Sequence, residues 1–371
     1  MKVAILFGSL NRGGTETLML DVFRSIDTNQ ISMIGIYRKD GVLRNSFEKS
    51  NCEMLHVAVR KNPFVYFASL RKVLIKNGVR IVHVVQSLDV ILSKIACLGT
   101  DIKICQTIHG FDFNHGILSK TLVAWSLNLT DINVFVSKYQ HRIYNDIFYQ
   151  RNKKNRLVVY NGISFDKFCV DYKDKLNHEI TNNHQSIVLL SVGNFNSGRD
   201  QLALCRFALS LKKKDINFQW FFAGKRIEND PQRYDQCVDF CKENNLEDNV
   251  AFLGSRDDVP QLLSQADLFV YASEHDTFGI AVIEAIAAGV PVMVNDWPVM
   301  NEVTLNGELA TIYKTKSEDS FYECFYDFMN NREMYNEKAK MASKKVRELY
   351  SIDKHINELF ERVYKPLLSK S

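Results

Sequence analysis

Apolar runs alternate with stretches of helical periodicity along almost the whole chain. Each run is short and continuous, and most are followed by a segment whose apolar residues recur every three or four positions. The runs cover residues 3–7, 33–37, 54–57, 81–85, 104–108, 132–136 and 157–160, and then 187–192, 218–223, 250–253, 268–271 and 290–294. Continuous apolar strands that alternate with helices predict parallel sheets covered by helices on both faces, an α/β fold.

The alternation stops once, in a polar and charged stretch from Asp166 to Gln185, and then begins again. This stretch is the best candidate for a linker. We therefore predict two doubly wound domains, residues 1–168 and 169–371, and a length of 371 residues lets each bury its own core. The last forty residues are expected to be helical, and the final helix is expected to pack back on the first domain.

The composition, 46% hydrophobic and 24% charged, is that of a soluble globular protein. The apolar start of the chain is short and lacks a small-residue cleavage site, so it is interpreted as a first strand and not as a signal peptide. No apolar run approaches the roughly 18 residues of a spanning helix. Eight cysteines without a C-x-x-C pair suggest reduced thiols and a cytoplasmic protein. Cys237 and Cys241 share a helical face, which a disulfide or a metal site could use, but ordinary packing of small apolar residues is expected.

Charge is distributed unevenly between the two halves. Residues 1–168 hold 23 Lys and Arg against 12 Asp and Glu, whereas the remainder holds 24 against 31. Chance surface variation is one explanation; the other is that the first half meets an anionic membrane surface, a phosphorylated acceptor or nucleic acid. No nucleic-acid-binding motif is present, so no nucleic acid partner is expected.

Residues 60–76 mix aromatic and basic side chains. Phe64, Phe67, Leu70 and Leu74 have the spacing of a helix packed on the sheet. The basic residues of the segment could still face anionic lipid, and we expect reversible, peripheral attachment at the inner face of the cell membrane through Lys61, Arg71, Lys72 and Lys76.

The segment from Ser273 to Ala285 is the most informative part of the chain. An apolar run ends in small and acidic residues, Gly279 opens a helix, and Gly289 with Pro291 ends it. Unpaired N–H groups at such a helix start attract anions. Asp276 and Glu284, eight positions apart, can accept hydrogen bonds from sugar or ribose hydroxyl groups, so the segment suits a nucleotide sugar.

Three further strand ends carry candidate ligand contacts, because open parallel sheets bind ligands beyond the carboxyl ends of their strands. The glycine-rich loop at residues 8–16 is neither G-x-G-x-x-G nor a phosphate loop, and a tight turn without a ligand is the alternative. Arg199 follows another strand and can neutralise a departing diphosphate, or be a solvated residue at a helix start. His109 can bind a sugar hydroxyl or phosphate, or be structural like His83.

In this order, these segments resemble glycosyltransferase family 4, the retaining enzymes of the GT-B fold that are frequent in bacterial polysaccharide assembly. The similar segments are residues 11–16, 81–83, 107–110, 136–137, 159–163, 191–200, 222–224, 250–254, 267–273 and 276–291. The resemblance implies two Rossmann-like domains facing each other across a cleft, the first binding the acceptor and the second the nucleotide sugar. It also implies transfer of a sugar, from UDP in particular, to a hydroxyl of a glycan or lipid-linked acceptor, which enters near Gly14 and residues 114–115.

The resemblance assigns a role to each candidate residue. The E-x7-E motif of the family falls on Asp276 and Glu284, so Glu284 would bind ribose and Asp276 would contact the transferred sugar. The Arg/Lys pair of the family falls on Asn194 and Arg199. The backbone at Phe278, Gly279 and Ile280 would lie against the sugar and the diphosphate. Gly14 would approach the diphosphate, and His109 would contact the sugar near the reacting carbon.

Two departures from the family pattern stand out. Asp276 replaces a glutamate and is shorter by one methylene, and Asn194 replaces a cation. Lys225, Arg226 or Arg256 could supply the missing charge. No D-x-D sequence is present, so no cofactor and no metal ion are expected, and Arg199 and the helix N–H groups would stabilise the diphosphate.

Two other functions remain open on the sequence alone. The first is a nucleotide-sugar epimerase or hydrolase on the same scaffold. The second is a non-catalytic module that binds a nucleotide sugar, which the changes at Asn194 and Asp276 would suit.

Overall fold

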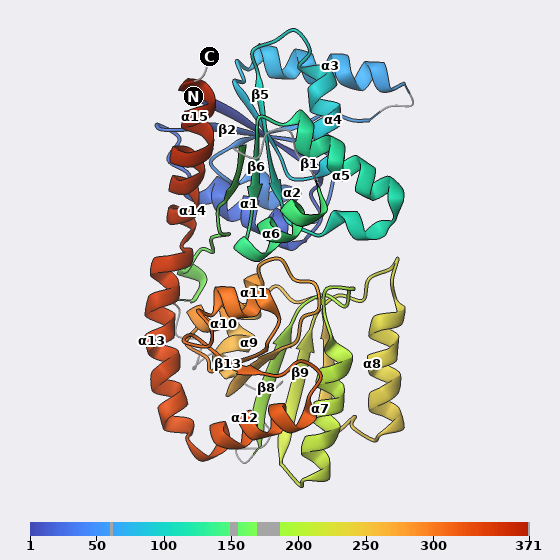
Figure 1. The fold of residues 1–371 in the computed structure, drawn as a ribbon, viewed down its shortest axis with the longest axis vertical. Helices are drawn as coiled ribbons and strands as arrows, with labels where there is room; N and C mark the ends of the chain where they lie inside the picture. The colour runs from blue at the N-terminus through green and yellow to red at the C-terminus, as the bar shows by residue number, and fades with distance from the viewer. Residues whose placement is uncertain (60–61, 149–154, 169–185, 370–371) are drawn as a thin grey trace. The chain divides into compact units, whose positions relative to one another are not determined.

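A computed structural model describes residues 1–59, 62–148, 155–168 and 186–369 (Figure 1). The chain divides into two compact units. Unit 1 comprises Met1–Ser164 and Tyr350–Ser371, and unit 2 comprises Phe165–Leu349. The division therefore lies four residues before the predicted boundary, and the C-terminal 22 residues belong to the first unit and not to the second.

Unit 1 contains one sheet in which every pairing is parallel, with strands in the order β3-β2-β1-β4-β5-β6-β7. The strands are β1 (Lys2–Ser9), β2 (Ser32–Lys39), β3 (Glu53–His56), β4 (Ile81–Val84), β5 (Lys103–Ile108), β6 (Ile132–Phe135) and β7 (Arg156–Val158). The chain first adds strands on one side of β1 and then on the other. The gap between β1 and β4 is therefore the topological switch point of this sheet.

Helices cover both faces of this sheet. They are α1 (Gly14–Ser25), α2 (Arg44–Glu48), α3 (Pro63–Lys76), α4 (Ser87–Ala96), α5 (Ile117–Leu129) and α6 (Lys138–Ile147), with the short η1 (Asp112–His115). Alternate residues of β1 feed two different cores: Val3, Ile5 and Phe7 pack with α1, whereas Ala4 and Leu6 pack with α3 and α4. The alternation of side chains in a strand explains why the whole run is apolar.

The predicted packing of α3 is correct at Leu70 and Leu74, partly correct at Phe67, and wrong at Phe64; the buried Tyr66 was not predicted. Tyr66, Leu70 and Leu74 lie four apart and are buried against the sheet. Phe64, which was expected on this face, is 77% exposed, because a residue two positions before Tyr66 lies on the other side of the helix.

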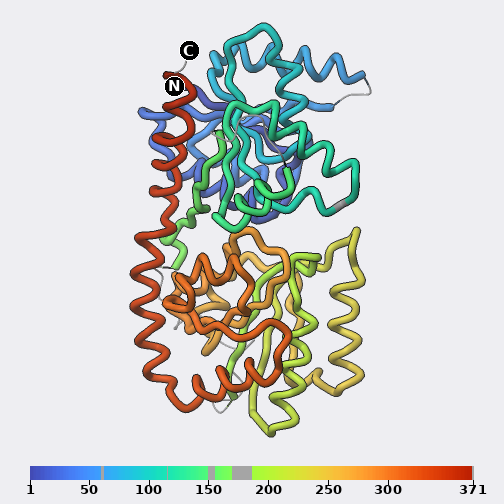
Figure 2. Tube along the Cα trace, in the orientation of Figure 1, coloured from blue at the N-terminus to red at the C-terminus, as the bar shows by residue number. Residues whose placement is uncertain are grey.

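The C-terminal segment completes the core of unit 1. It contains α14 (Ile352–Leu359), the π-helix η4 (Phe360–Tyr364) and α15 (Lys365–Ser369), and it lies beside α1 (Figure 2). The Tyr364 hydroxyl lies 2.7 Å from Nδ1 of His83, and Nε2 of His83 lies 2.7 Å from the Thr107 hydroxyl. His83 is therefore a buried structural residue that joins the end of the chain to β4 and β5.

Unit 2 contains a second all-parallel sheet, in the order β10-β9-β8-β11-β12-β13. Its strands are β8 (Ile187–Val192), β9 (Phe218–Ala223), β10 (Val250–Gly254), β11 (Leu268–Tyr271), β12 (Val292–Asn295) and β13 (Thr311–Tyr313). Its helices are η3 (Asp166–Phe168), α7 (Gln201–Lys213), α8 (Gln232–Glu243), α9 (Val259–Gln265), α10 (Ile280–Ala287), α11 (Pro298–Val303), α12 (Glu318–Asn330) and α13 (Arg332–Tyr350). The order of strands reverses at β8, so the switch point of this sheet lies between β8 and β11.

Aromatic residues fill the core of unit 2 between the sheet and its helices. The rings of Phe207 and Phe321 stack with their centroids 4.4 Å apart, and the Trp220 ring lies 6.0 Å from Phe321. Cys237 and Cys241 are free thiols in the same core. None of the described helices combines the length and the apolar character that crossing a membrane requires.

Candidate active site

The loops that follow β8 and β11 meet at the switch point of unit 2. The backbone N–H of Asp200 donates to the carbonyl of Ala272, and the N–H of Glu274 donates to the carbonyl of Gly198. The Ser273 hydroxyl donates to the Gly198 carbonyl as well, at 3.2 Å. These bonds join the two loops, so that residues 77 positions apart in the sequence, Arg199 and Asp276, are brought together.

Arg199 and Asp276 form an ion pair with 2.5 Å between Nη1 and Oδ2. The guanidinium group also lies over the Tyr271 ring, 4.7 Å from its centroid, and the Tyr271 hydroxyl donates to the same carboxylate oxygen of Asp276. The two charged side chains are 17% and 16% exposed, so both can be reached from solvent. Burial disfavours the charge on Arg199, but attraction to Asp276 and Tyr271 outweighs it, and the pKa of Arg199 is raised.

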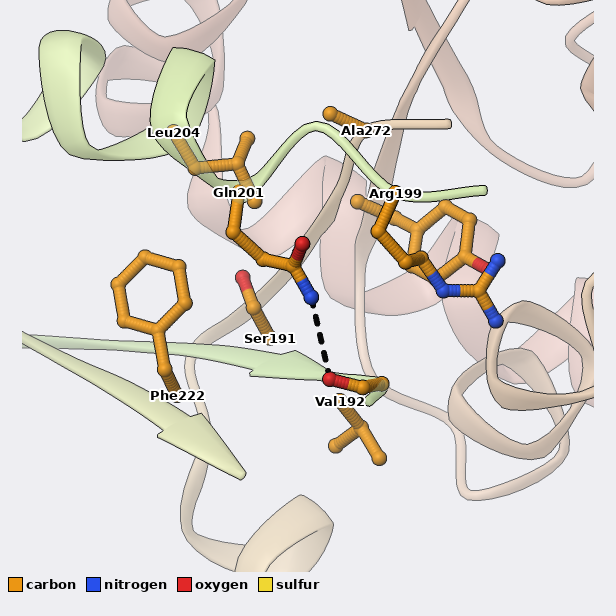
Figure 3. Close-up of a pocket in the computed structure, with 9 residues that line it drawn as sticks. Ser191, Val192, Arg199, Gln201, Leu204, Phe222 and Ala272 are labelled. Atoms are coloured by element: carbon orange, nitrogen blue, oxygen red, sulfur yellow. Dashed lines mark hydrogen bonds between the residues drawn. The ribbon is translucent and has the colours of Figure 1, made fainter. Parts of the chain in front are cut away.

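The end of β8 is shaped to admit this guanidinium. A Cβ atom added at Gly193 would lie 2.7 Å from Nε of Arg199, so any larger residue would displace the side chain. Arg199 and Gln201 line a recess at the ends of β8, β9 and β11, and the Gln201 amide donates to the Gly193 carbonyl at 3.1 Å (Figure 3). Nε of Arg199 is buried and has no hydrogen-bond partner in the described part of the chain.

The loop that carries Asp276 is held by residues that the sequence analysis did not select. Asn295, at the end of β12, accepts from the Ser273 N–H and donates to the Ser273 carbonyl, at 3.0 and 2.8 Å. The Ser273 hydroxyl accepts from the N–H of Asp276, and the Trp297 indole donates to the Asp276 carbonyl. Asn295 directly follows an apolar run, and this position at the end of a predicted strand was the feature of the sequence that could have identified it as a site residue.

The helix α10 starts from an unusual backbone conformation at its N-cap, Gly279. Its φ of 82° is in the left-handed region, and a Cβ atom there would lie 2.8 Å from Cε of Met300, so a larger residue would be both strained and crowded. This turn places the backbone of Phe278, Gly279 and Ile280 at the start of α10, close behind Asp276. The first N–H groups of a helix have no partner within the helix and favour an anion.

Glu284 lies in the second turn of α10, and its side chain is 15% exposed. Its Oε1 lies 2.7 Å from Nζ of Lys167, which comes from the short η3 helix. Lys167 was not selected from the sequence, and its separation of 117 residues from Glu284 left no local signal.

The structure gives Asn194 a structural contact. Its Oδ1 accepts from the backbone N–H of Lys225 at 2.9 Å, which ties the loop after β9 to the loop after β8. Of the three cations considered as substitutes, Arg226 is paired with Asp235 and Arg256 with Asp258 through two hydrogen bonds each. Lys225 makes only a loose contact, 3.8 Å from Glu228, and is 55% exposed.

Two of the predicted site residues, Gly14 and His109, belong to unit 1. Gly14 begins α1 after the loop of residues 10–13 that follows β1, and the N-cap Gly13 provides no side-chain cap. His109 directly follows β5. Burial lowers the pKa of His109 to about 3, with smaller contributions from His83 and His355, so its imidazole is neutral at physiological pH.

Comparison with known proteins identifies the family of this chain. Residues 13–167 match the protein family described as "Glycosyltransferase Family 4", and residues 173–348 match the family described as "Glycosyl transferases group 1". N-acetyl-alpha-D-glucosaminyl L-malate synthase of Bacillus anthracis is 24% identical over 73% of this chain and 70% of its own length. A GDP-mannose:cellobiosyl-diphosphopolyprenol alpha-mannosyltransferase of Xanthomonas oryzae pv. oryzae is 23% identical over 82% and 81%.

Solved structures agree on the fold. HepE of Anabaena, solved in complex with UDP and glucose, superposes with a TM-score of 0.85 at 14% identity and covers 98% of this chain and 99% of its own. Two parallel-sheet units of this kind make up the GT-B fold. The chain belongs to the family 4 glycosyltransferases of the GT-B fold, and it is an enzyme that transfers sugars.

Proposed function

We propose that the enzyme takes its sugar from a nucleotide diphosphate, in particular a UDP-sugar, and that unit 2 binds this donor. The observation that carries the proposal is the grouping of Arg199, Asp276 and the start of α10 at the switch point between β8 and β11. A guanidinium and free helix N–H groups are the donors that a diphosphate requires. Glu284, one helical turn further on, accepts hydrogen bonds from ribose hydroxyls.

The transferred sugar lies against Asp276 and the backbone of Phe278, Gly279 and Ile280 in this proposal. Arg199 and the N-terminus of α10 stabilise the negative charge that develops on the departing diphosphate. The acceptor hydroxyl is itself the nucleophile, and the anomeric configuration is retained, as the family pattern implies. The family pattern also implies a contact of His109 with the sugar and a close approach of Gly14 to the diphosphate.

The acceptor is a glycan or a lipid-linked molecule, and the reaction belongs to cell-surface polysaccharide biosynthesis. This part of the proposal is supported by the name of the Xanthomonas relative, which states a diphosphopolyprenol acceptor, and by the excess of basic residues in residues 1–168. The Bacillus relative is named for an acceptor of another kind, malate, and both named acceptors are anionic.

Binding of the donor is tested by thermal unfolding in the presence of UDP, GDP and their sugars. A ligand at about one hundred times its dissociation constant adds about 2.7 kcal/mol to the free energy of unfolding. We expect UDP and at least one UDP-sugar to stabilise the protein in this way. Absence of stabilisation by any nucleoside diphosphate would contradict the proposed donor.

Catalysis without a divalent metal is also part of the proposal, since Arg199 and the start of α10 supply the positive charge that a metal would otherwise bring. Transfer should continue in EDTA. Loss of transfer in EDTA and its return on addition of manganese would show that a metal is required.

We further propose that the cytoplasmic enzyme attaches reversibly to the inner face of the membrane through unit 1. Phe64 on α3 and Ile117, Leu118 and Trp125 on α5 are all at least 60% exposed. Of the basic residues expected to face lipid, Arg71, Lys72 and Lys76 lie on α3 with Phe64, and Lys61 lies outside the described residues. Sedimentation with anionic liposomes at low salt should recover the protein with the lipid, whereas zwitterionic liposomes should recover much less. Equal recovery in the supernatant with both would rule out the attachment.

A further inference from the structure

Unit 1 has its own buried ion pair at the switch point of its sheet. Arg38 lies near the end of β2, and Asp89 lies in the first turn of α4, directly after β4. Nη2 of Arg38 lies 3.0 Å from Oδ1 of Asp89. Asp89 is fully buried, whereas the Arg38 side chain keeps 16% of its surface exposed.

Gly8 makes room for this pair. In the sheet, Phe7 and Ser9 of β1 are level with Tyr37 and Lys39 of β2, so Gly8 is level with Arg38. A Cβ atom at Gly8 would lie 2.6 Å from Oε1 of Gln86 and 3.1 Å from Nη2 of Arg38. The Arg38 guanidinium therefore crosses over the end of β1 and donates to Gln86 at 3.2 Å.

Several hydrogen-bond donors of Arg38 and Gln86, in the cluster that these residues form with Asp89, have no partner among the described residues. Nε of Arg38 is buried and has no hydrogen-bond partner among the described residues. The guanidinium contacts Gln86 and Asp89 through Nη2 alone, so Nη1 has no partner in the described chain either. Gln86 is exposed, and within the described chain its amide nitrogen donates to nothing. An unpartnered buried guanidinium N–H costs free energy unless a ligand or water satisfies it.

The same arrangement occurs at the switch point of unit 2. There too an arginine that is mostly buried, Arg199, is paired with one aspartate, and its Nε lacks a partner. In each unit the pair lies where open parallel sheets bind ligands. In unit 2 this position is the proposed diphosphate site.

We propose that the cluster of Arg38, Gln86 and Asp89 is an anion subsite of unit 1, which binds a carboxylate or phosphate group carried by the acceptor. The guanidinium and the amide supply the donors, and Asp89 holds the guanidinium in place over Gly8. This inference rests on the proposed transfer reaction only for the statement that the anion belongs to the acceptor. The alternative, a network that only joins the carboxyl ends of the inner strands, predicts no anion binding.

The probes are inorganic phosphate and acetate, titrated calorimetrically into the full-length protein saturated with UDP, so that the donor site is filled. We expect one phosphate or acetate site per chain. The probe that binds with the higher affinity identifies the class of anion. Arg38→Gln should weaken binding at least about tenfold. Arg44→Gln is the matched control, because Arg44 lies on the same unit but is 46% exposed and paired with Asp40 and Glu48.

Asp89→Asn should change anion binding in the opposite direction to Arg38→Gln. Removing the competing carboxylate while keeping Arg38 should tighten phosphate binding by about tenfold, which a purely structural role would not do. The double variant Arg38→Gln/Asp89→Asn removes both buried charges, so it tests the loss of binding even if Arg38→Gln alone does not fold.

The outcomes separate the two proposals. If UDP binds but phosphate and acetate bind equally well to the wild type and to the double variant, or bind to neither, the anion subsite is wrong and the proposed donor stands. If UDP itself does not bind, the proposed function fails, and the titrations without UDP still decide the subsite.

Discussion

The ion pair between Arg199 and Asp276 shows how this chain arranges its charges around the expected donor. A buried pair of this kind contributes little to stability, because desolvation offsets the attraction. Its effect is to hold the guanidinium over Tyr271 in one orientation. A diphosphate must then compete with Asp276 for Arg199. Because an aspartate stands in place of the usual glutamate, the carboxylate lies nearer to its own backbone by one methylene.

Lys225 is the residue that we expect to replace the cation missing at Asn194. It is the least engaged of the three nearby cations, and its backbone is fixed by Asn194 itself. Lys225→Met should weaken UDP binding about fivefold, or about 1 kcal/mol, as expected for an exposed charge. The neighbouring variant Arg226→Met, which breaks only the pair with Asp235, should bind UDP like the wild type. If both variants keep the wild-type affinity, the lost cation is not replaced from this loop.

At the scale of elements, the site depends on how the loops after β8 and β11 are joined. Asn295 on β12 supports this junction through Ser273, and it also donates to the Thr315 hydroxyl. Because Asn295 is buried, its loss would leave backbone groups of Ser273 without partners.

Asn295→Ala should therefore lower the free energy of unfolding by about 2–4 kcal/mol, measured by urea denaturation. The matched control is Asn331→Ala, whose side chain bonds on the surface to Asp327; it should change stability by less than about 0.5 kcal/mol. A similar small change in both variants would mean that Asn295 does not support the loop.

The elements themselves could be predicted from the sequence, since continuous apolar runs and helical spacing are local properties. The loops that hold Arg199 and Asp276, and the helix that carries Glu284, were predicted for the same reason. The partners of these residues were not: Tyr271, Asn295 and Lys167 reach them only through the order of strands and the path of the chain, which periodicity does not contain. The helix α7 starts at Gln201 and not at Arg199, because Asp200 caps it by accepting from the N–H of Ala203.

At the scale of the molecule, two similar units are built from one alternating pattern, and the end of the chain returns to the first of them. Two buried histidines mark that return. His83 bonds to Tyr364, and Nδ1 of His355 lies 2.7 Å from the Tyr160 carbonyl. Burial lowers the pKa of His83 to about 3 and that of His355 to about 4.

These shifts predict that unit 1 loses stability in acid. Between pH 6.5 and the lowered values, the unfolded state binds protons that the folded state does not. The contribution of each buried neutral histidine to the free energy of unfolding is therefore complete above pH 6.5, and at pH 5 it is lower by about 2 kcal/mol. Asp89 acts in the opposite direction, because burial raises its pKa to about 6, but its effect is smaller.

Urea denaturation at pH 7.5 and pH 5 measures this loss. His355→Asn should reduce the difference in the free energy of unfolding between the two pH values. Equal stability of the wild type at both pH values would contradict the burial of neutral histidines.

The central claim is that a nucleoside diphosphate binds at the switch point of unit 2 through Arg199. Calorimetric titration of UDP into the wild type, Arg199→Gln and Arg206→Gln tests it most directly, because Arg206 is an exposed arginine on the helix that follows Arg199. We expect Arg199→Gln to bind UDP at least about tenfold more weakly and Arg206→Gln to bind it like the wild type. Equal affinity of the wild type and Arg199→Gln, or no binding of UDP to the wild type, would contradict the claim.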